Sequence, residues 1–260
     1  MVRIKEVKNK VCYIEIDRPK QMNSLDKRTI QELINFFKTS SNSLDFNVVV
    51  FSGSNNFFSA GADLKWMQQA VEQSYQENYE DAQLFNRLYQ EMSLYPKQII
   101  VKVKRGAYGG AIGLMACADV VITSSDANFR FSETALGLVP ATVAPYILKK
   151  IGHSNANFLL ISAHQFNGDD ALRFGLAHKV VVYEEIDKTA LQTAEEMAKL
   201  GLEAVIKTKK LINKLSENTF TVSNETQDYC ASVIAKARTS HEGQERVKAF
   251  LNRNDSSKNE

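Results

Sequence analysis

Apolar residues in the first part of the chain fall into short runs that alternate with amphipathic stretches. The β-branched and aromatic run at residues 11–16 ends at Asp17-Arg18-Pro19, which is typical of a short strand that closes in a turn. A helix is predicted after Asp26, which is placed as its N-cap. Its apolar stripe has the spacing i, i+3, i+4, i+7 and consists of Ile30, Leu33, Ile34 and Phe37.

Three further runs are apolar without alternation, at residues 48–51, 99–103 and 120–123. Continuous apolar strands are typical of a parallel sheet that is buried on both faces. Since these strands alternate with helical segments, the pattern predicts an α/β fold with crossover connections.

The C-terminal third is predicted to be mostly helical. After about Ala156 one plausible strand remains, at residues 179–182. Helices are predicted over residues 188–200, 203–215, 224–238 and 241–251. No linker interrupts the chain, so we expect a core domain over residues 1–195, a helical extension over 196–254 and a frayed polar tail at 255–260.

Composition excludes several classes of protein. The 32 Lys and Arg nearly balance the 30 Asp and Glu, which gives a formal charge of +2 and argues against a nucleic-acid binder. Cys12, Cys117 and Cys230 are far apart and are expected to be reduced thiols. Apolar runs are far shorter than the roughly 20 residues that span a bilayer, and no secretory signal is recognised. A soluble, cytoplasmic protein is expected.

Two glycine-bearing loops carry the most informative pattern, FFSAGADL at residues 57–64 and GAYGGAIG at 106–113. Each follows a buried strand and opens a helix, where backbone N–H groups lack partners and can bind an anion. Two converging donors would make an oxyanion hole. Taken singly, each loop is better explained by tight packing or left-handed φ values than by a function. GAYGGAIG has the spacing of neither a Walker A loop nor a dinucleotide-binding fingerprint.

The combination of motifs changes this balance. FSAGADL, GAYGGAIGL and FRFSETALGLVP occur in that order, after Asp17-Arg18-Pro19 with Asn23 and before Glu242-Gly243 with Ala249-Phe250. Over nearly its whole length the chain resembles the enoyl-CoA hydratase/isomerase superfamily, the crotonases. FSAGADLKWM and SETALGLVPATVAP look most like bacterial hydratases of branched acyl-CoAs, of the methylglutaconyl-CoA hydratase type.

The resemblance implies a crotonase-like α/β fold of repeated β-β-α units with a helical C-terminal extension. It also implies a homo-trimer or homo-hexamer built through that extension, and a place in fatty acid metabolism or leucine degradation. A physical motive for association is an apolar stripe in the helix predicted from residue 224, which a small extension cannot bury alone. This stripe consists of Thr226, Tyr229, Val233 and Ile234.

The catalytic residues implied by the resemblance belong to the three motifs. The backbone N–H groups of Ala62 and Gly110 would form the oxyanion hole that stabilises a thioester enolate. Glu133 would be the general acid/base. Hydratases of the superfamily commonly have a second glutamate, but Gly113 stands at that position here. A two-carboxylate clamp for water is therefore not assembled from the expected residues.

Other site residues are implied for the two ends of the substrate. Coenzyme A would enter as part of the thioester, with no permanently bound cofactor. Its expected contacts are Arg18, Lys20, Ala60, Lys65 and Arg253. The acyl pocket is expected to include Trp66, Met67 and Pro140. The four histidines lack metal-ligand spacing, so no metal site is predicted.

Three functions follow from these residues. The first is a hydratase that adds water to an α,β-unsaturated, branched or unbranched, enoyl-CoA through an oxyanion-stabilised enolate. The second is an enoyl-CoA double-bond isomerase with Glu133 as its single base. The third is a crotonase-fold protein that binds acyl-CoA without turnover. Gly113 favours the second and third, whereas the intact loops and Glu133 oppose the third.

Overall fold

A twisted sheet of six strands forms the centre of the computed structural model, which describes residues 1–215 and 223–256 and the side chains of residues 1–214 and 223–252. In spatial order the strands are β1 (Val2–Lys8), β2 (Val11–Ile16), β3 (Val48–Gly53), β4 (Gln98–Val103), β6 (Val120–Ser124) and β9 (Lys179–Val181). Only the β1–β2 pair is antiparallel. The strands predicted from apolar runs are therefore confirmed.

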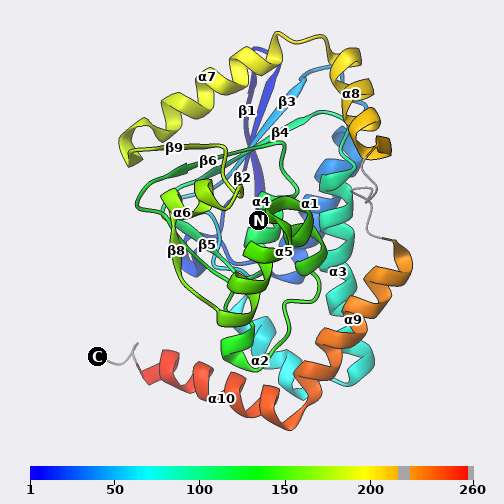
Figure 1. Ribbon diagram of the computed structural model, residues 1–260, viewed down its shortest axis with the longest axis vertical. Helices are drawn as coiled ribbons and strands as arrows, with labels where there is room; N and C mark the ends of the chain where they lie inside the picture. Colours follow the sequence, from blue (N-terminus) through cyan, green and yellow to red (C-terminus); the bar gives the residue numbers. More distant parts are fainter. Residues whose placement is uncertain (216–222, 257–260) are drawn as a thin grey trace.

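Helices cover both faces of this sheet, which explains why its strands are apolar without alternation (Figure 1). Val48 and Val50 face α7 (Ile186–Ala198). Val49 and Phe51 face the larger core beneath α1 (Lys27–Ser40) and α3 (Tyr75–Ser93). Successive residues of one strand thus enter two separate apolar layers.

A second, smaller sheet is formed by β5 (Gly106–Tyr108), β7 (Asn128–Arg130) and β8 (Phe166–Asn167). The sequence of a long strand, a short strand and a helix recurs, since β4 leads through β5 to α4 (Gly110–Ala116) and β6 through β7 towards α5 (Ala144–Ser162). After β3, a single bridge between Ser59 and Ala107 takes the place of the short strand before α2 (Leu64–Glu72). These are the expected β-β-α units.

The predicted helices are present, with differences at their ends. The Asp26 side chain accepts a hydrogen bond of 2.7 Å from the Thr29 N–H and caps α1, as expected. The C-terminal helices are α7, α8 (Leu202–Leu215), α9 (Asn224–Thr239) and α10 (His241–Ser256). α5 and α6 (Gly168–Arg173) lie between the third motif and the C-terminal helices. Short 3-10 helices occur near the N-terminus (η1, Pro19–Gln21), within the third motif (η2, Thr134–Leu136) and before α7 (η3, Tyr183–Glu185). The expected domain boundary after residue 195 falls inside α7, and residues 257–260 of the expected tail lie outside the described chain.

The last two helices fold back onto the core at the end of the molecule that contains α2 (Figure 1). α9 lies along α3 and α10 contacts α2, around a small apolar cluster that includes Ile234, Val247 and Leu251. Ile234 is 6% exposed, whereas Tyr229 is 70% exposed. The chain's own α3 therefore covers part of the predicted stripe, and the role of the stripe in association stays a prediction. No helix in the described ranges is long and apolar enough to cross a membrane.

Candidate functional site

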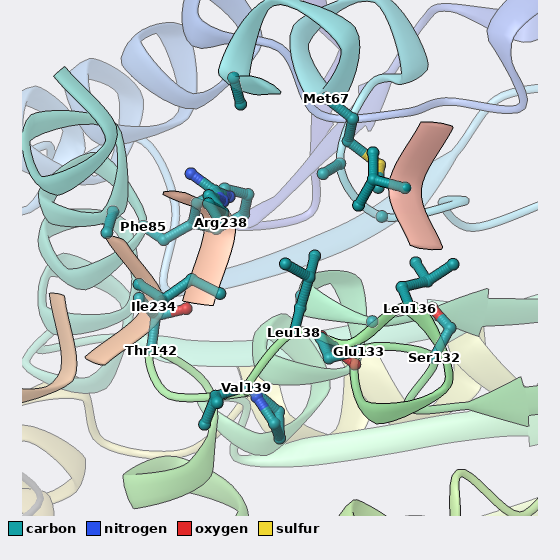
Figure 2. Close-up of a pocket in the computed structure, with 18 of the residues that line it drawn as sticks. Met67, Phe85, Ser132, Glu133, Leu136, Leu138, Val139, Thr142, Ile234 and Arg238 are labelled. Atoms are coloured by element: carbon teal, nitrogen blue, oxygen red, sulfur yellow. The ribbon is translucent and has the colours of Figure 1, made fainter. Parts of the chain in front are cut away.

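A cavity of about 140 Å³ opens where the two glycine-bearing loops meet the segment after β7. Residues from 60–64, 109–110 and 132–142 line it, together with side chains of α2, α3, α9 and α10. Most of these side chains are apolar, and several are shown as sticks in Figure 2. The three motifs of the sequence analysis thus contribute to one cavity.

The two loops are packed directly against each other. The N–H of Tyr108 donates a hydrogen bond of 3.1 Å to the Ser59 carbonyl. Gly61 has φ of +83°, and a Cβ at this position would lie 2.6 Å from the carbonyl oxygen of Tyr108. A residue with a Cβ would be strained by the positive φ and would clash with the Tyr108 carbonyl, so glycine permits the close approach of the loops.

Ala62 and Gly110 both line the cavity, each near a helix start. Gly110 is the first residue of α4, where a backbone N–H has no acceptor within the helix. In the described part of the chain, neither the Ala62 N–H nor the Gly110 N–H donates a hydrogen bond. Two backbone donors are therefore available to a ligand in this cavity.

The first loop is held by a group of charged and polar side chains behind it. Asp63 caps α2 by accepting hydrogen bonds from Lys65 N–H (2.9 Å) and Trp66 N–H (3.4 Å). The Arg18 guanidinium and the Ser24 hydroxyl each donate to the same carboxylate at 2.9 Å. Burial tends to raise the pKa of Asp63, but these donors outweigh it and lower the pKa. Asp63 remains ionised and fixes the loop.

Glu133 borders the second loop, with its Oε1 atom 3.1 Å from the position of a Cβ at Gly109. Its Oε2 atom is buried and has no hydrogen-bond partner among the described residues. Burial raises the pKa of Glu133 to about 7. Among the described lining residues Glu133 is the sole carboxylate, so it is placed to exchange a proton with a ligand.

Gly113 lies in α4 but does not line the cavity. A Cβ at this position would lie 2.7 Å from the ring of Tyr89 and 2.8 Å from Cγ2 of Val143. The Tyr89 hydroxyl also donates a hydrogen bond of 2.7 Å to the Gly110 carbonyl. The space next to Gly113 is thus filled by a buried tyrosine, and a glutamate would not fit this packing.

The residues expected in the acyl pocket divide into two groups. Met67 and Pro140 line the cavity. Trp66 does not; its ring stacks on Phe85 with 5.7 Å between centroids, and its indole N–H donates to Asp81 at 2.6 Å. Trp66 therefore packs against Phe85, which lines the cavity, and is not itself part of the lining.

The residues expected near coenzyme A are spread more widely. Ala60 lines the cavity, and the exposed side chains of Lys20 and Lys65 lie outside its lining. The Arg18 guanidinium is engaged by Asp63, by the Ser24 carbonyl at 2.6 Å and by Asp26 at 3.1 Å. Arg253 belongs to α10, but its side chain lies outside the described part of the chain. Their contacts with coenzyme A stay predictions.

The sequence analysis missed the wall that the C-terminal helices supply. Ile234, Arg238, Val247 and Phe250 line the cavity, as does Thr142. The i, i+4 spacing of Ile234 and Arg238 indicates a shared helix face. Nothing in the sequence places this face beside motifs that lie much earlier in the chain. Within the described residues, no group of three or more His, Cys, Asp and Glu is arranged to hold a metal ion.

Comparisons with known proteins agree with this geometry. A family model described as enoyl-CoA hydratase/isomerase matches residues 6–257. The crotonyl-CoA hydratase of Syntrophomonas wolfei is 31% identical over 81% of this chain and 81% of its own. The 2,3-dehydroadipyl-CoA hydratase of Escherichia coli is 25% identical over 93% and 92%.

A solved structure gives the same result for the fold. The crystal structure of a putative enoyl-CoA hydratase/isomerase (crotonase) from Legionella pneumophila is 34% identical, covers 95% of both chains and superposes with a TM-score of 0.79. Sequence motifs, fold and site geometry therefore lead to one conclusion: the chain belongs to the enoyl-CoA hydratase/isomerase family and has the crotonase fold.

Proposed function

We propose that this protein is a hydratase that adds water across the α,β double bond of an enoyl-CoA thioester. The observation that carries the proposal is the unpartnered carboxylate of Glu133, in the same cavity as the N–H groups of Ala62 and Gly110. Relatives named as hydratases support it. Coenzyme A arrives and leaves with the substrate.

The proposed reaction uses these groups in sequence. The thioester oxygen accepts hydrogen bonds from the N–H groups of Ala62 and Gly110, which stabilise negative charge when the enolate forms. The Glu133 carboxylate takes a proton from water as the water oxygen bonds to the β-carbon. The protonated Glu133 then gives a proton to the α-carbon, and the thioester is restored. A pKa of about 7 lets one residue act in both directions near neutral pH.

Isomerisation of the double bond is the second candidate, because Tyr89 and Val143 fill the space beside Gly113. Glu133 would then remove a proton from the α-carbon of a 3-enoyl-CoA and return it to the γ-carbon. The same backbone donors would stabilise the dienolate. A preference for branched chains, of the methylglutaconyl-CoA hydratase type, is a narrower proposal. It is supported by the sequences FSAGADLKWM and SETALGLVPATVAP. The second of these includes Pro140 and Thr142, which line the cavity.

The test is turnover of purified protein with 2-enoyl-, 3-enoyl- and branched unsaturated CoA esters, with products identified by mass spectrometry. The addition of one water to a 2-enoyl-CoA supports the hydratase. Conversion of a 3-enoyl-CoA to its 2-enoyl isomer at unchanged mass, without hydration, supports the isomerase instead. Binding of CoA esters without any product supports the non-catalytic alternative. Glu133→Gln is the matched control, since any of these products must be lost with it.

A further inference from the structure

Arg238 introduces a positive charge into the wall of the cavity. It lies one helical turn after Ile234 on α9, and both residues line the cavity. In Figure 2 its side chain enters on the side of Phe85 and Ile234, across from Ser132 and Leu136. Its Nη1 atom is buried and has no hydrogen-bond partner among the described residues.

The Arg238 residue is only partly buried, but its Nη1 atom is enclosed without a partner. This requires an explanation, because enclosing a charged group without a hydrogen bond costs free energy. Burial lowers the pKa of Arg238, but an arginine guanidinium stays protonated in proteins. The cavity wall around it is apolar, with Ala82, Phe85 and Leu138 among its members. The surroundings of Arg238 therefore favour a negatively charged ligand group over a hydrocarbon.

Two carboxylates of the protein are considered as partners of Arg238. Asp81 acts to raise the pKa of Arg238 against the larger effect of burial, but its carboxylate accepts a hydrogen bond of 2.6 Å from the Trp66 indole N–H and pairs with Lys27 at 2.7 Å. Its charge is already balanced. Glu133 lines the same cavity, yet its Oε2 has no partner and the described chain contains no ion pair between Glu133 and Arg238. The guanidinium is left for the ligand.

We propose that Arg238 binds a carboxylate at the far end of the acyl chain, so that the preferred substrates are CoA thioesters of unsaturated dicarboxylic acids. This inference rests on the proposed function, which places the thioester at Ala62, Gly110 and Glu133. A planar guanidinium can pair with a carboxylate through two parallel hydrogen bonds. A neutral acyl chain would leave the enclosed Nη1 atom without a hydrogen-bond partner and bind less well.

The test compares acyl chains that differ in the terminal group alone. Matched 2-enoyl-CoA esters of five to seven carbons would carry a terminal carboxylate, its methyl ester or a terminal methyl group. For the wild-type protein we expect kcat/KM to be at least about 10-fold higher with the carboxylate. Arg238→Met should lower that value by about 10- to 100-fold and change the two neutral series little. Lys236→Met is the control, because it removes an exposed cation from the same helix.

A binding measurement separates this inference from the proposed function. Calorimetry with adipyl-CoA and hexanoyl-CoA, which are saturated, reports recognition without turnover. If the wild-type protein turns over none of the esters but binds adipyl-CoA more tightly than hexanoyl-CoA, the proposed hydratase is overturned and the role of Arg238 is supported. A wild-type preference for hexanoyl-CoA, or equal losses for both esters in Arg238→Met, would overturn the role of Arg238.

Folding of the variant is checked by its thermal midpoint. Removing an unpaired buried cation should not lower that midpoint. If Arg238→Met does not fold, Arg238→Lys replaces it, since it keeps the charge but loses the two-pronged geometry. If Arg238→Lys prefers the carboxylate series less strongly than the wild type does, the inference is supported. If its preference equals that of the wild type, the inference is contradicted.

Discussion

At the scale of single residues, the proposed reaction depends on Glu133. Its Oε2 is buried without a partner in the described chain, and no second carboxylate of that part lines the cavity. We expect Glu133→Gln to lower kcat by roughly 10²- to 10⁴-fold, the usual contribution of general acid/base catalysis. Calorimetry should show unchanged CoA-ester binding, because the donors at Ala62 and Gly110 remain. Turnover at the wild-type rate would remove Glu133 from the mechanism.

The raised pKa of Glu133 predicts the pH dependence of the reaction. Burial raises this pKa to about 7, and the ionised form is the one that accepts the proton. As the pH falls through about 7, the ionised fraction falls, so kcat/KM should rise with pH up to about 7 and level off above it. A profile measured with a non-ionising acyl chain tests this. A rate that is flat from about pH 5 to 8 would contradict it.

Gly113 shows what residue identity alone could not reveal. The resemblance identifies it as the position of a missing glutamate, which suggests an empty place beside the substrate. In the structure, the ring of Tyr89 and the Val143 side chain occupy that place. Tyr89 lies 24 residues before Gly113, on α3, whereas Gly113 lies on α4. Only the tertiary packing shows that Tyr89 fills the place that a glutamate side chain at position 113 would take.

At the scale of elements, the contact between the two loops can be tested with a pair of glycines. Gly61 (φ +83°) and Gly175 (φ +82°) have nearly equal positive φ angles, so the backbone strain of an alanine costs about 1–2 kcal/mol at either. A Cβ at Gly61 would lie 2.6 Å from the Tyr108 carbonyl, whereas at Gly175 the nearest atom is at 3.9 Å. We expect Gly61→Ala to unfold at lower denaturant concentration than Gly175→Ala and to lose turnover, because Ala62 moves. Equal effects would argue against a role for the loop contact.

Some of the helices and strands could be predicted from the sequence, and others could not. The long apolar strands and capped helices have strong local patterns, and they were confirmed. β5, β7 and β8 have two or three residues each, too few for any periodicity to indicate a strand. The two glycine-bearing loops could be recognised because backbone geometry requires small residues at fixed spacing. The apolar wall from α9 and α10 could not, since one helical face resembles another until its partner is known.

At the scale of the whole molecule, the expected trimer or hexamer needs an interface. α3 covers part of the apolar stripe of α9, and further exposed apolar side chains lie on α5, with Phe158 46% and Ile161 67% exposed. We expect light scattering to show an oligomer and Ile161→Asp to reduce its mass, since a buried unpaired charge opposes association. Leu44→Asp, at an 82% exposed position before β3, is the control. A monomeric wild-type protein would contradict the expectation.

The cavity wall joins parts of the chain that are distant in sequence. Its loops and Glu133 belong to the first 142 residues, whereas Ile234, Arg238, Val247 and Phe250 come from the last two helices. A ligand that touches both sides adds its binding free energy to the docking of α9 and α10. Local opening of these helices then becomes rarer. Amide hydrogen exchange in residues 224–252 should therefore slow when an acyl-CoA is bound, while exchange in α7, remote from the cavity, stays unchanged.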